Sequence, residues 1–273
     1  MNRPMVSVVM PAYNVERYVE EAIQSILDQT FRDFEFIIID DGSTDGTGDI
    51  IDRHAAADPR IVYVQNQSNL GQTKSMNKGI ELARGKYICR MDADDISYPD
   101  RLERQLTFME SNPDVVISGG TMEVCNRDMK LICRRIYNLT DVEIRRKLFR
   151  YSPFCHPSTI YRTEGAKTIG GYSEVIFPAE DYDFYFRLGR LGAFANLPDV
   201  IYKMRVNPSG ISYSNIRKSE IMTLYVRLKA VFEYDYSMTG ADKIYFAAQS
   251  ASMLFMPAKA KYWLFTWCRS VIR

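Results

Sequence analysis

Short apolar runs alternate with amphipathic helical segments along the first hundred residues, and this order constrains the fold more than any other feature. Nearly continuous apolar runs occupy residues 6–10, 34–39, 61–64 and 87–91. Such runs are typical of parallel strands that helices cover on both faces. Between them, residues 18–27 and 73–83 carry apolar side chains at helical spacing. The alternation predicts an α/β fold with a Rossmann-like, doubly wound, mostly parallel sheet.

The pattern changes after residue 98. Helices are predicted at residues 101–111, 141–150 and 180–191, and strands at 115–119, 131–137 and 156–161. Beyond about residue 210 the chain is predicted to be helical again. We therefore expect one domain over residues 1–210, with halves at 1–98 and 99–210, and a C-terminal helical extension over 211–273.

Acidic residues gather in three groups, two of them where predicted strands end. The groups lie at residues 40–41, 92–95 and 180–183. Ligands of doubly wound sheets bind beyond the carboxyl ends of the strands, so the first two groups are expected to converge there. Like charges so close together are unfavourable without a positive charge between them. Because Mg²⁺ is usually held by one or two carboxylates and substrate phosphates, the pattern predicts a metal–diphosphate site with a separate catalytic base.

Composition excludes several other classes of protein. The chain has 35 basic and 34 acidic residues, which argues against a nucleic-acid-binding domain. Its five cysteines are widely spaced and form no Cys-x-x-Cys motif, as expected of reduced thiols in a cytoplasmic protein. The first apolar run is too short for a signal-peptide core, and no stretch of about 18 apolar residues predicts a membrane span.

Five segments in a fixed order resemble the inverting family 2 glycosyltransferases, which have the GT-A fold. They are Val-Ser-Val-Val-Met-Pro-Ala-Tyr-Asn at 6–14, Asp-Asp-Gly-Ser-Thr-Asp at 40–45, Asn-Leu-Gly at 69–71 with Asn-Lys-Gly at 77–79, Met-Asp-Ala-Asp-Asp at 91–95 and Ala-Glu-Asp-Tyr-Asp at 179–183. The resemblance covers about residues 5–205. It implies transfer of a hexose from a nucleotide-diphosphate sugar, UDP-linked or alternatively dTDP-linked, to a hydroxyl of a glycan or lipid-linked acceptor in cell-surface polysaccharide synthesis.

The resemblance assigns the first half of the domain to the donor and a divalent cation, Mn²⁺ or Mg²⁺. Asp94 is the expected direct metal ligand, and Asp92 is expected to contact the ribose or the metal. Asp41 would accept a hydrogen bond from the imide N–H of the base, whereas Asp40 would either help to bind the nucleotide or cap a helix. The remaining residues expected to contact the nucleotide sugar are Pro11, Ala12, Tyr13, Gly71, Gln72, Lys74 and Ala93. For Lys74 the alternative is a solvated helix charge.

The resemblance assigns the second half to the acceptor. Asp181 is expected to be the catalytic base and Glu180 its neighbour, each with a pKa raised by the other carboxylates. Asp183 is expected to serve structure. The alternative for the whole group is an acidic first helical turn, which the helix dipole favours.

The chain departs from the family pattern at two positions, and one further residue has two interpretations. Met76 stands where an arginine is common. Arg205 stands where the family commonly has a histidine; an arginine does not bind metal, so we expect it to pair with the diphosphate. His156 is predicted either to contact the metal or the acceptor, or to be structural.

The end of the chain mixes aromatic and basic residues. This composition suits a helix lying in a membrane interface, which would place the protein at the inner face of the membrane. The alternative is a helix packed on the catalytic domain.

Two other functions compete with glycosyl transfer. A sugar nucleotidyltransferase shares the sheet and the metal carboxylates, but residues 11–16 are not the glycine-rich loop that such an enzyme needs. A degenerate nucleotide-binding scaffold would agree with Met76 and Arg205. A dinucleotide oxidoreductase is disfavoured because no Gly-x-Gly-x-x-Gly follows the first strand.

Overall fold

The computed structural model describes residues 3–206 and 215–256. The strands are β1 (Val6–Ala12), β2 (Phe34–Asp40), β3 (Ile61–Gln65), β4 (Tyr87–Arg90), β5 (Ile96–Ser97), β6 (Val115–Cys125), β7 (Leu131–Arg135), β8 (Ile160–Arg162) and β9 (Ala193–Arg205). The helices are α1 (Val19–Leu27), α2 (Thr47–Ala57), α3 (Gln72–Leu82), α4 (Arg101–Ser111), α5 (Asp141–Lys147), α6 (Thr163–Thr168), α7 (Glu180–Leu188), α9 (Ile216–Glu233) and α10 (Gly240–Phe255), with a 3₁₀ turn, η1, at His156–Ser158.

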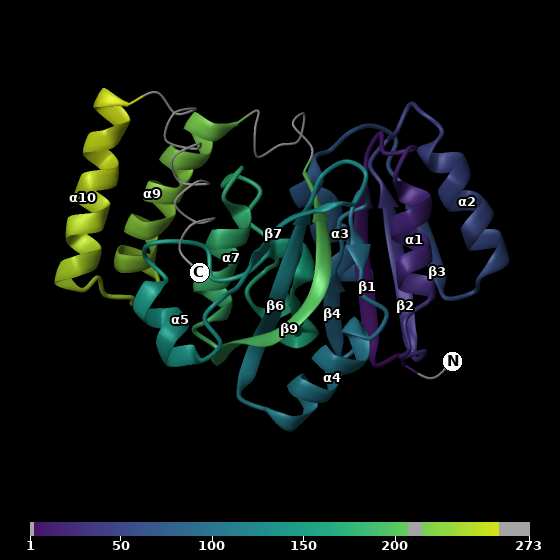
Figure 1. Ribbon diagram of the computed structural model, residues 1–273, viewed down its shortest axis with the longest axis horizontal. Coiled ribbons are helices and arrows are strands. Elements are labelled where there is room, and N and C mark those ends of the chain that lie inside the picture. Colours follow the sequence, from purple (N-terminus) through teal and green to yellow (C-terminus); the bar gives the residue numbers. More distant parts are fainter. Residues whose placement is uncertain (1–2, 207–214, 257–273) are drawn as a thin grey trace.

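One nine-stranded sheet runs through the middle of the molecule (Figure 1). Its order is β3-β2-β1-β4-β8-β6-β9-β5, and β7 pairs with β6. The first four strands are parallel to one another, with helices connecting them. The predicted α/β fold with a doubly wound, mostly parallel sheet is confirmed.

The second half of the sheet is mixed. β8 runs antiparallel to β4 and β6, whereas β6 and β9 are parallel and form the longest pair. Sequence patterns did not predict β9 or α6. The strand predicted at 156–161 is wrong in its first part, where η1 precedes β8. Pro157 explains this, because it has no N–H to donate to a strand ladder.

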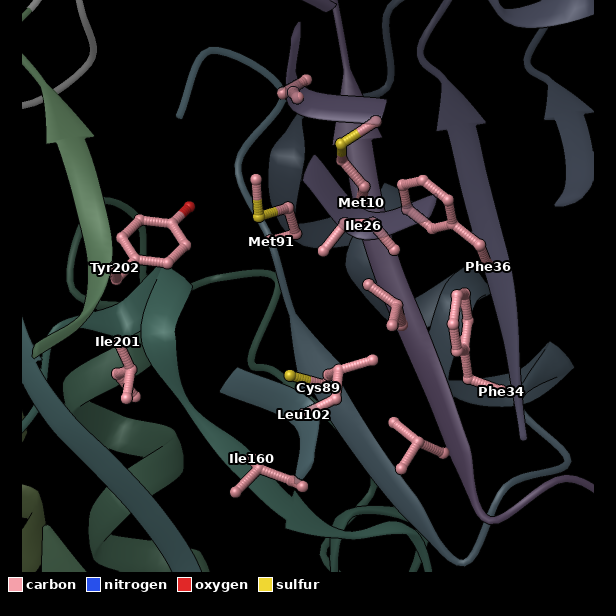
Figure 2. Packing of buried hydrophobic residues seen from close by; sticks show 14 of the residues in the cluster. Met10, Ile26, Phe34, Phe36, Cys89, Met91, Leu102, Ile160, Ile201 and Tyr202 are labelled. Atoms are coloured by element: carbon pink, nitrogen blue, oxygen red, sulfur yellow. The ribbon is translucent and has the colours of Figure 1, made fainter. Parts of the chain in front are cut away.

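The sheet separates two apolar cores. Val8 and Met10 of β1 face the core formed with α1, α2 and α4, while Val9 faces the core formed with α3, α6 and α7. Figure 2 shows the first core, in which Met91 lies between the β1 side chains and Tyr202 of β9. Because successive side chains of a strand point to opposite faces, burial on both faces produces the nearly continuous apolar runs of the sequence.

The helices α9 and α10 lie side by side at the end of the molecule opposite α1 and α2 (Figure 1). Val226 and Ala230 of α9 are buried in the core that includes α7. The buried Arg227 donates to the carbonyl oxygen of Arg150 over 3.0 Å. For residues 216–255 the structure supports the alternative of helices packed on the preceding domain. The aromatic and basic residues of 257–273 lie outside the described residues.

None of the helices within residues 3–206 and 215–256 has both the length and the apolarity to cross a bilayer.

The close contact of α3 with β1 gives a first prediction. A Cβ on Gly79 would lie 2.3 Å from Cγ1 of Val9, so Gly79→Ala must push helix and sheet apart. We expect urea denaturation to show a loss of about 1–3 kcal/mol of unfolding free energy. Gly240→Ala is the matched control, because a Cβ there meets no atom within 4 Å. Equal stability of the two variants would contradict the packing described.

Candidate active site

The loop after β4 gathers three carboxylates. One carboxylate oxygen from each of Asp92, Asp94 and Asp95 lies within 4.8 Å of the others. The backbone N–H of Asp92 donates to the hydroxyl of Tyr202 over 3.1 Å, so β9 helps to position the loop. Three carboxylate oxygens at this spacing suit a hard divalent cation, which prefers oxygen ligands.

The raised pKa values in this acidic loop also favour a bound cation. Burial and the nearby charge of Asp92 raise the pKa of Asp94 to about 6. Burial, together with the charges of Asp94 and Asp92, raises the pKa of Asp95 well above its usual value. A bound cation would relieve this repulsion, because an opposite charge favours the ionised form.

Arg205 holds the acidic loop from β9. Its backbone N–H donates to Oδ1 of Asp95 over 2.7 Å, and its Nε donates to the carbonyl oxygen of Asp94 over 2.8 Å. Its Nη2 pairs with Glu21 at 2.7 Å, and its guanidinium lies 4.5 Å from the ring centre of Tyr18. The structure does not support the predicted pairing of Arg205 with a diphosphate, because protein groups already engage the guanidinium.

Asp40 is the last residue of β2 and Asp41 follows it, and both are buried. Asp41 accepts hydrogen bonds from the backbone N–H groups of Leu70, at 3.0 Å, and Gly71, at 2.8 Å. It therefore fixes the turn that precedes α3, where Gly71 has a φ of +91°. Asp40 accepts from the backbone N–H of Ser43 over 3.0 Å. Asp40 thus shapes the turn before α2 and does not cap that helix directly.

The other residues predicted to bind the donor lie at the same edge of the sheet. Pro11 and Ala12 end β1 beside β2, and Tyr13 follows them with 43% of its surface exposed. At the start of α3, Nε2 of Gln72 is 3.5 Å from Oδ1 of Asp92. Lys74 is exposed on α3, and Ala93 is buried inside the acidic loop.

The acidic turn of α7 forms the second half of the candidate site. Glu180 is 7% exposed, and burial together with the charge of Asp181 raises its pKa to about 7. Burial also raises the pKa of Asp181, whose Oδ1 accepts from the backbone N–H of Tyr182 over 2.7 Å. Asp183 faces elsewhere and pairs with Arg187 at 2.7 Å. The acidic turn therefore contains two carboxyl groups with raised pKa values and a third that forms an ion pair within the helix.

Arg90 links the two acidic groups and was missed by the sequence analysis. Its guanidinium is buried at the end of β4, and its Nη2 lies 2.7 Å from Oδ1 of Asp92. Its positive charge opposes the rise in pKa of Asp94, Glu180 and Asp181 alike. The acidic loop and the acidic turn are therefore close enough to share one electrostatic field. The available signal was an arginine within an apolar run that ends in carboxylates.

His156 lies in an aromatic group and outside the close carboxylate group. Its Nε2 is 2.9 Å from the hydroxyl of Tyr172, and Tyr185 packs against its ring. Burial and the charge of Arg90 lower the pKa of His156 well below its usual value, so the ring is neutral. This environment supports the structural alternative for His156 and gives no support to the metal contact.

Asn77 ties α3 to the segment that leads into α7. Its side chain donates to the carbonyl oxygen of Tyr172 over 2.9 Å and accepts from the N–H of the same residue over 2.8 Å. The asparagine of the Asn-Lys-Gly segment thus has a structural explanation.

A groove of about 620 Å³ lies on another part of the described surface. It is lined by α4 and by residues of β9 that include Asp199, and none of the predicted site residues lines it. Arg104 pairs there with Asp100 at 2.6 Å and also with Asp199. The groove is a surface feature separate from the candidate site.

The raised pKa of Glu180 gives a prediction about stability. In the native state Glu180 keeps its proton up to about pH 7, whereas its ordinary pKa is 4.5. The native state therefore binds more protons between these values, and stability falls as the pH rises through that window. Glu180→Gln removes the effect, so we expect the variant to be about 2 kcal/mol more stable than the wild type at pH 8 and similar to it at pH 4.5.

Urea denaturation at the two pH values measures this difference. Glu174→Gln is the control, because Glu174 is an exposed glutamate in the segment that precedes α7. A difference between Glu180→Gln and wild type that does not change with pH would contradict the pKa described.

Comparison with known proteins agrees with this geometry. Residues 7–169 match the model of glycosyl transferase family 2. An uncharacterized glycosyltransferase of Methanocaldococcus jannaschii is 33% identical over 229 residues, which cover 82% of this chain and 79% of the relative. The amylovoran biosynthesis glycosyltransferase AmsE of Erwinia amylovora is 31% identical, and the match covers 96% of this chain and 98% of AmsE.

Two solved structures share the fold. TarS of S. aureus in complex with UDP-GlcNAc has a TM-score of 0.72 and 20% identity, covering 92% of this chain and 73% of that one. The mannosyltransferase PcManGT of Pyrobaculum calidifontis, in complex with GDP-Man and Mn²⁺, has a TM-score of 0.66 and 19% identity, covering 93% and 71%. With its sheet, its acidic loop and these matches, the chain belongs to glycosyl transferase family 2 and has the GT-A fold.

Proposed function

We propose that the protein is a metal-dependent, inverting hexosyltransferase acting in cell-surface polysaccharide synthesis. Its donor is a UDP-sugar, with a dTDP-sugar as the alternative, and its acceptor is a hydroxyl of a glycan or lipid-linked glycan at the cytoplasmic face of the membrane. The main support is the acidic loop, where one carboxylate oxygen from each of Asp92, Asp94 and Asp95 lies within 4.8 Å of the others. The buried Arg90 pairs with Asp92 there at 2.7 Å, and its charge also acts on the carboxylate of Asp181, so it links the loop to the acidic turn of α7. Such a link is what a reaction needs when one carboxylate group serves the donor and another the acceptor.

The donor half of the proposal depends on the acidic loop. Asp94 and Asp92 would hold a divalent cation, which supplies charge neutralisation for the diphosphate leaving group. Asp95 turns inward and accepts from the backbone of Arg205, so its role is to fix the loop. Asp41 and Gly71 would shape the wall beside the nucleotide, and the exposed Tyr13 offers a ring on which a base can stack.

The acceptor half depends on Asp181. Oδ1 of Asp181 accepts from the backbone N–H of Tyr182, which leaves Oδ2 to take the proton of the attacking hydroxyl. Glu180, with a pKa of about 7, places a second carboxyl group beside this base. As the hydroxyl oxygen attacks the anomeric carbon, its proton passes to Asp181 and the bond to the diphosphate breaks, which inverts the anomeric centre. A positioned base of this kind contributes about 10²–10⁴-fold to the rate.

Base preference follows from hydrogen-bond chemistry. An ionised carboxylate only accepts hydrogen bonds, so Asp41 suits the imide N–H of uracil or thymine. One structural neighbour was solved with UDP-GlcNAc and another with GDP-Man, which makes the base a property to be measured in this chain.

A test of the function combines binding with turnover. We expect UDP with Mn²⁺ to raise the melting temperature of the wild type more than GDP with Mn²⁺ does, since ligands that bind the native state stabilise it. Release of UDP from the cognate UDP-sugar should stop when a chelator is added. Asp181→Asn should lower kcat by about 10²–10⁴-fold while the melting-temperature shift with UDP is kept.

Asp183→Asn is the matched control, because Asp183 is an aspartate of the same helical turn whose side chain pairs with Arg187. Turnover in Asp181→Asn at the wild-type rate would contradict the role of this residue as base. Absence of turnover in the wild type with every donor tried would favour the degenerate scaffold. Release of pyrophosphate from a nucleoside triphosphate and a sugar phosphate would instead favour a nucleotidyltransferase.

Membrane contact through residues 257–273 is proposed from the sequence alone. From Lys243 to the end, the chain has five basic residues and no acidic one. We expect the full-length protein to co-sediment with vesicles that contain anionic lipid and to lose about tenfold in affinity when Trp263 and Trp267 are both changed to alanine. Changing Phe232 and Ile244, which are exposed on α9 and α10, to alanine is the control. Equal sedimentation of wild type and tail variant would remove the membrane from the proposal.

A further inference from the structure

Arg90 is a buried charge whose hydrogen bonds are incomplete. It is 1% exposed, and its Nη2 pairs with Oδ1 of Asp92 at 2.7 Å. Its Nε and Nη1 are buried without a hydrogen-bond partner among the residues that the structure describes. Buried polar groups are nearly always paired, so such a group calls for an explanation.

The neighbouring Arg101 shows what a structural arginine looks like in this protein. It is just as buried, but its guanidinium donates to the carbonyl oxygens of Arg90, at 2.8 Å, and Pro157, at 3.1 Å. Its Nε also donates to the side chain of Gln105 over 3.0 Å. Arg101 therefore connects strand and helix, whereas Arg90 makes one ion pair, and that pair is with a carboxylate of the candidate metal site.

The groups around Arg90 explain what its charge does. Asp92 and Asp94 lie on the acidic loop, and Glu180 and Asp181 on the acidic turn of α7. The other titratable neighbours, His156, Tyr161, Tyr172, Tyr185 and Tyr202, are neutral. Arg90 is thus a positive charge that attracts the carboxylates of both acidic groups and favours their ionised forms.

This charge affects a divalent cation in two ways. It repels the cation, and it occupies Oδ1 of Asp92, one of the oxygens that would otherwise be available as a ligand. A nucleotide diphosphate would reduce the repulsion between the cation and the Arg90 guanidinium, because its phosphates add negative charge to the site. Cation and arginine can then be accommodated together.

We propose that Arg90 is a positioning residue that makes cation binding at the acidic loop conditional on the nucleotide diphosphate. In the free protein the guanidinium serves as the counter-ion of Asp92, and the cation binds weakly. With the diphosphate present, the cation binds tightly and Arg90 remains as the internal charge between the two acidic groups. This inference rests on the proposed function, since it presumes a site for a diphosphate and a cation.

Mn²⁺ binding without turnover tests the proposal. Titration of the full-length protein with Mn²⁺, followed by the electron paramagnetic resonance signal of the free ion, should show weak binding alone and binding at least about tenfold tighter with saturating UDP. Arg90→Met removes the charge and keeps an apolar chain. We expect this variant to bind Mn²⁺ about tenfold more tightly than the wild type in the absence of UDP, and to gain less from UDP. Arg90→Lys, which keeps the charge, should resemble the wild type.

Arg227→Met is the matched control, because Arg227 is equally buried but belongs to α9. It should leave Mn²⁺ binding unchanged. Weaker Mn²⁺ binding by Arg90→Met in the absence of UDP would mean that Arg90 only holds Asp92 in place, and would overturn the proposal. If Arg90→Met does not fold, the wild-type measurement decides, since equal Mn²⁺ affinity with and without UDP also overturns it. Failure of UDP itself to bind the wild type would instead reject the proposed function.

Discussion

The close approach of buried carboxylates is the constraint on which the rest of this site depends. Asp94 and Glu180 have pKa values raised to about 6 and about 7, mainly because burial disfavours their charged forms. A fold that concentrates negative charge in this way gives up stability to do so, and such costs are typical of functional sites. Two arginines hold the acidic loop in place. Arg90 pairs with the carboxylate of Asp92, and Arg205 donates to the carbonyl oxygen of Asp94.

The sheet explains why residues far apart in sequence meet here. β1, β2 and β4 are parallel and adjacent, so their carboxyl ends lie at one edge together with the loops that follow them. β9 returns beside β6 and carries Arg205 to the acidic loop, while Asn77 connects α3 to the segment before α7. The site is therefore formed by the order of the strands, with side-chain contacts adjusting the loops.

The parallel half of the fold was predictable because its signals are local. Each apolar run with its following helix is contained within about thirty residues, and burial on both faces makes the run nearly continuous. The second half was less predictable, since β8 is only three residues long and β9 is defined by pairing with the distant β6. Pro157 delays the start of the predicted strand for a reason that is visible in the sequence.

The same distinction applies to the candidate site. Two of the acidic groups were found because carboxylates at strand ends have a direct chemical meaning, and the role of the third was assigned through the family resemblance. Arg205 was assigned to the diphosphate from its position in the family pattern. Its partner Glu21 lies far away in the sequence, where no pattern connects the two residues. Arg90 was overlooked because an arginine between apolar residues resembles an ordinary strand position until its burial is known.

A crystal structure of the full-length protein with Mn²⁺ and UDP would test the central claim most directly. The account predicts one cation between the carboxylates of Asp94 and Asp92 and the two phosphates, with Oδ2 of Asp181 open on the side where the sugar would lie. Nucleotide bound away from the acidic loop, for example in the groove beside α4, or a cation without contact to Asp94, would contradict it.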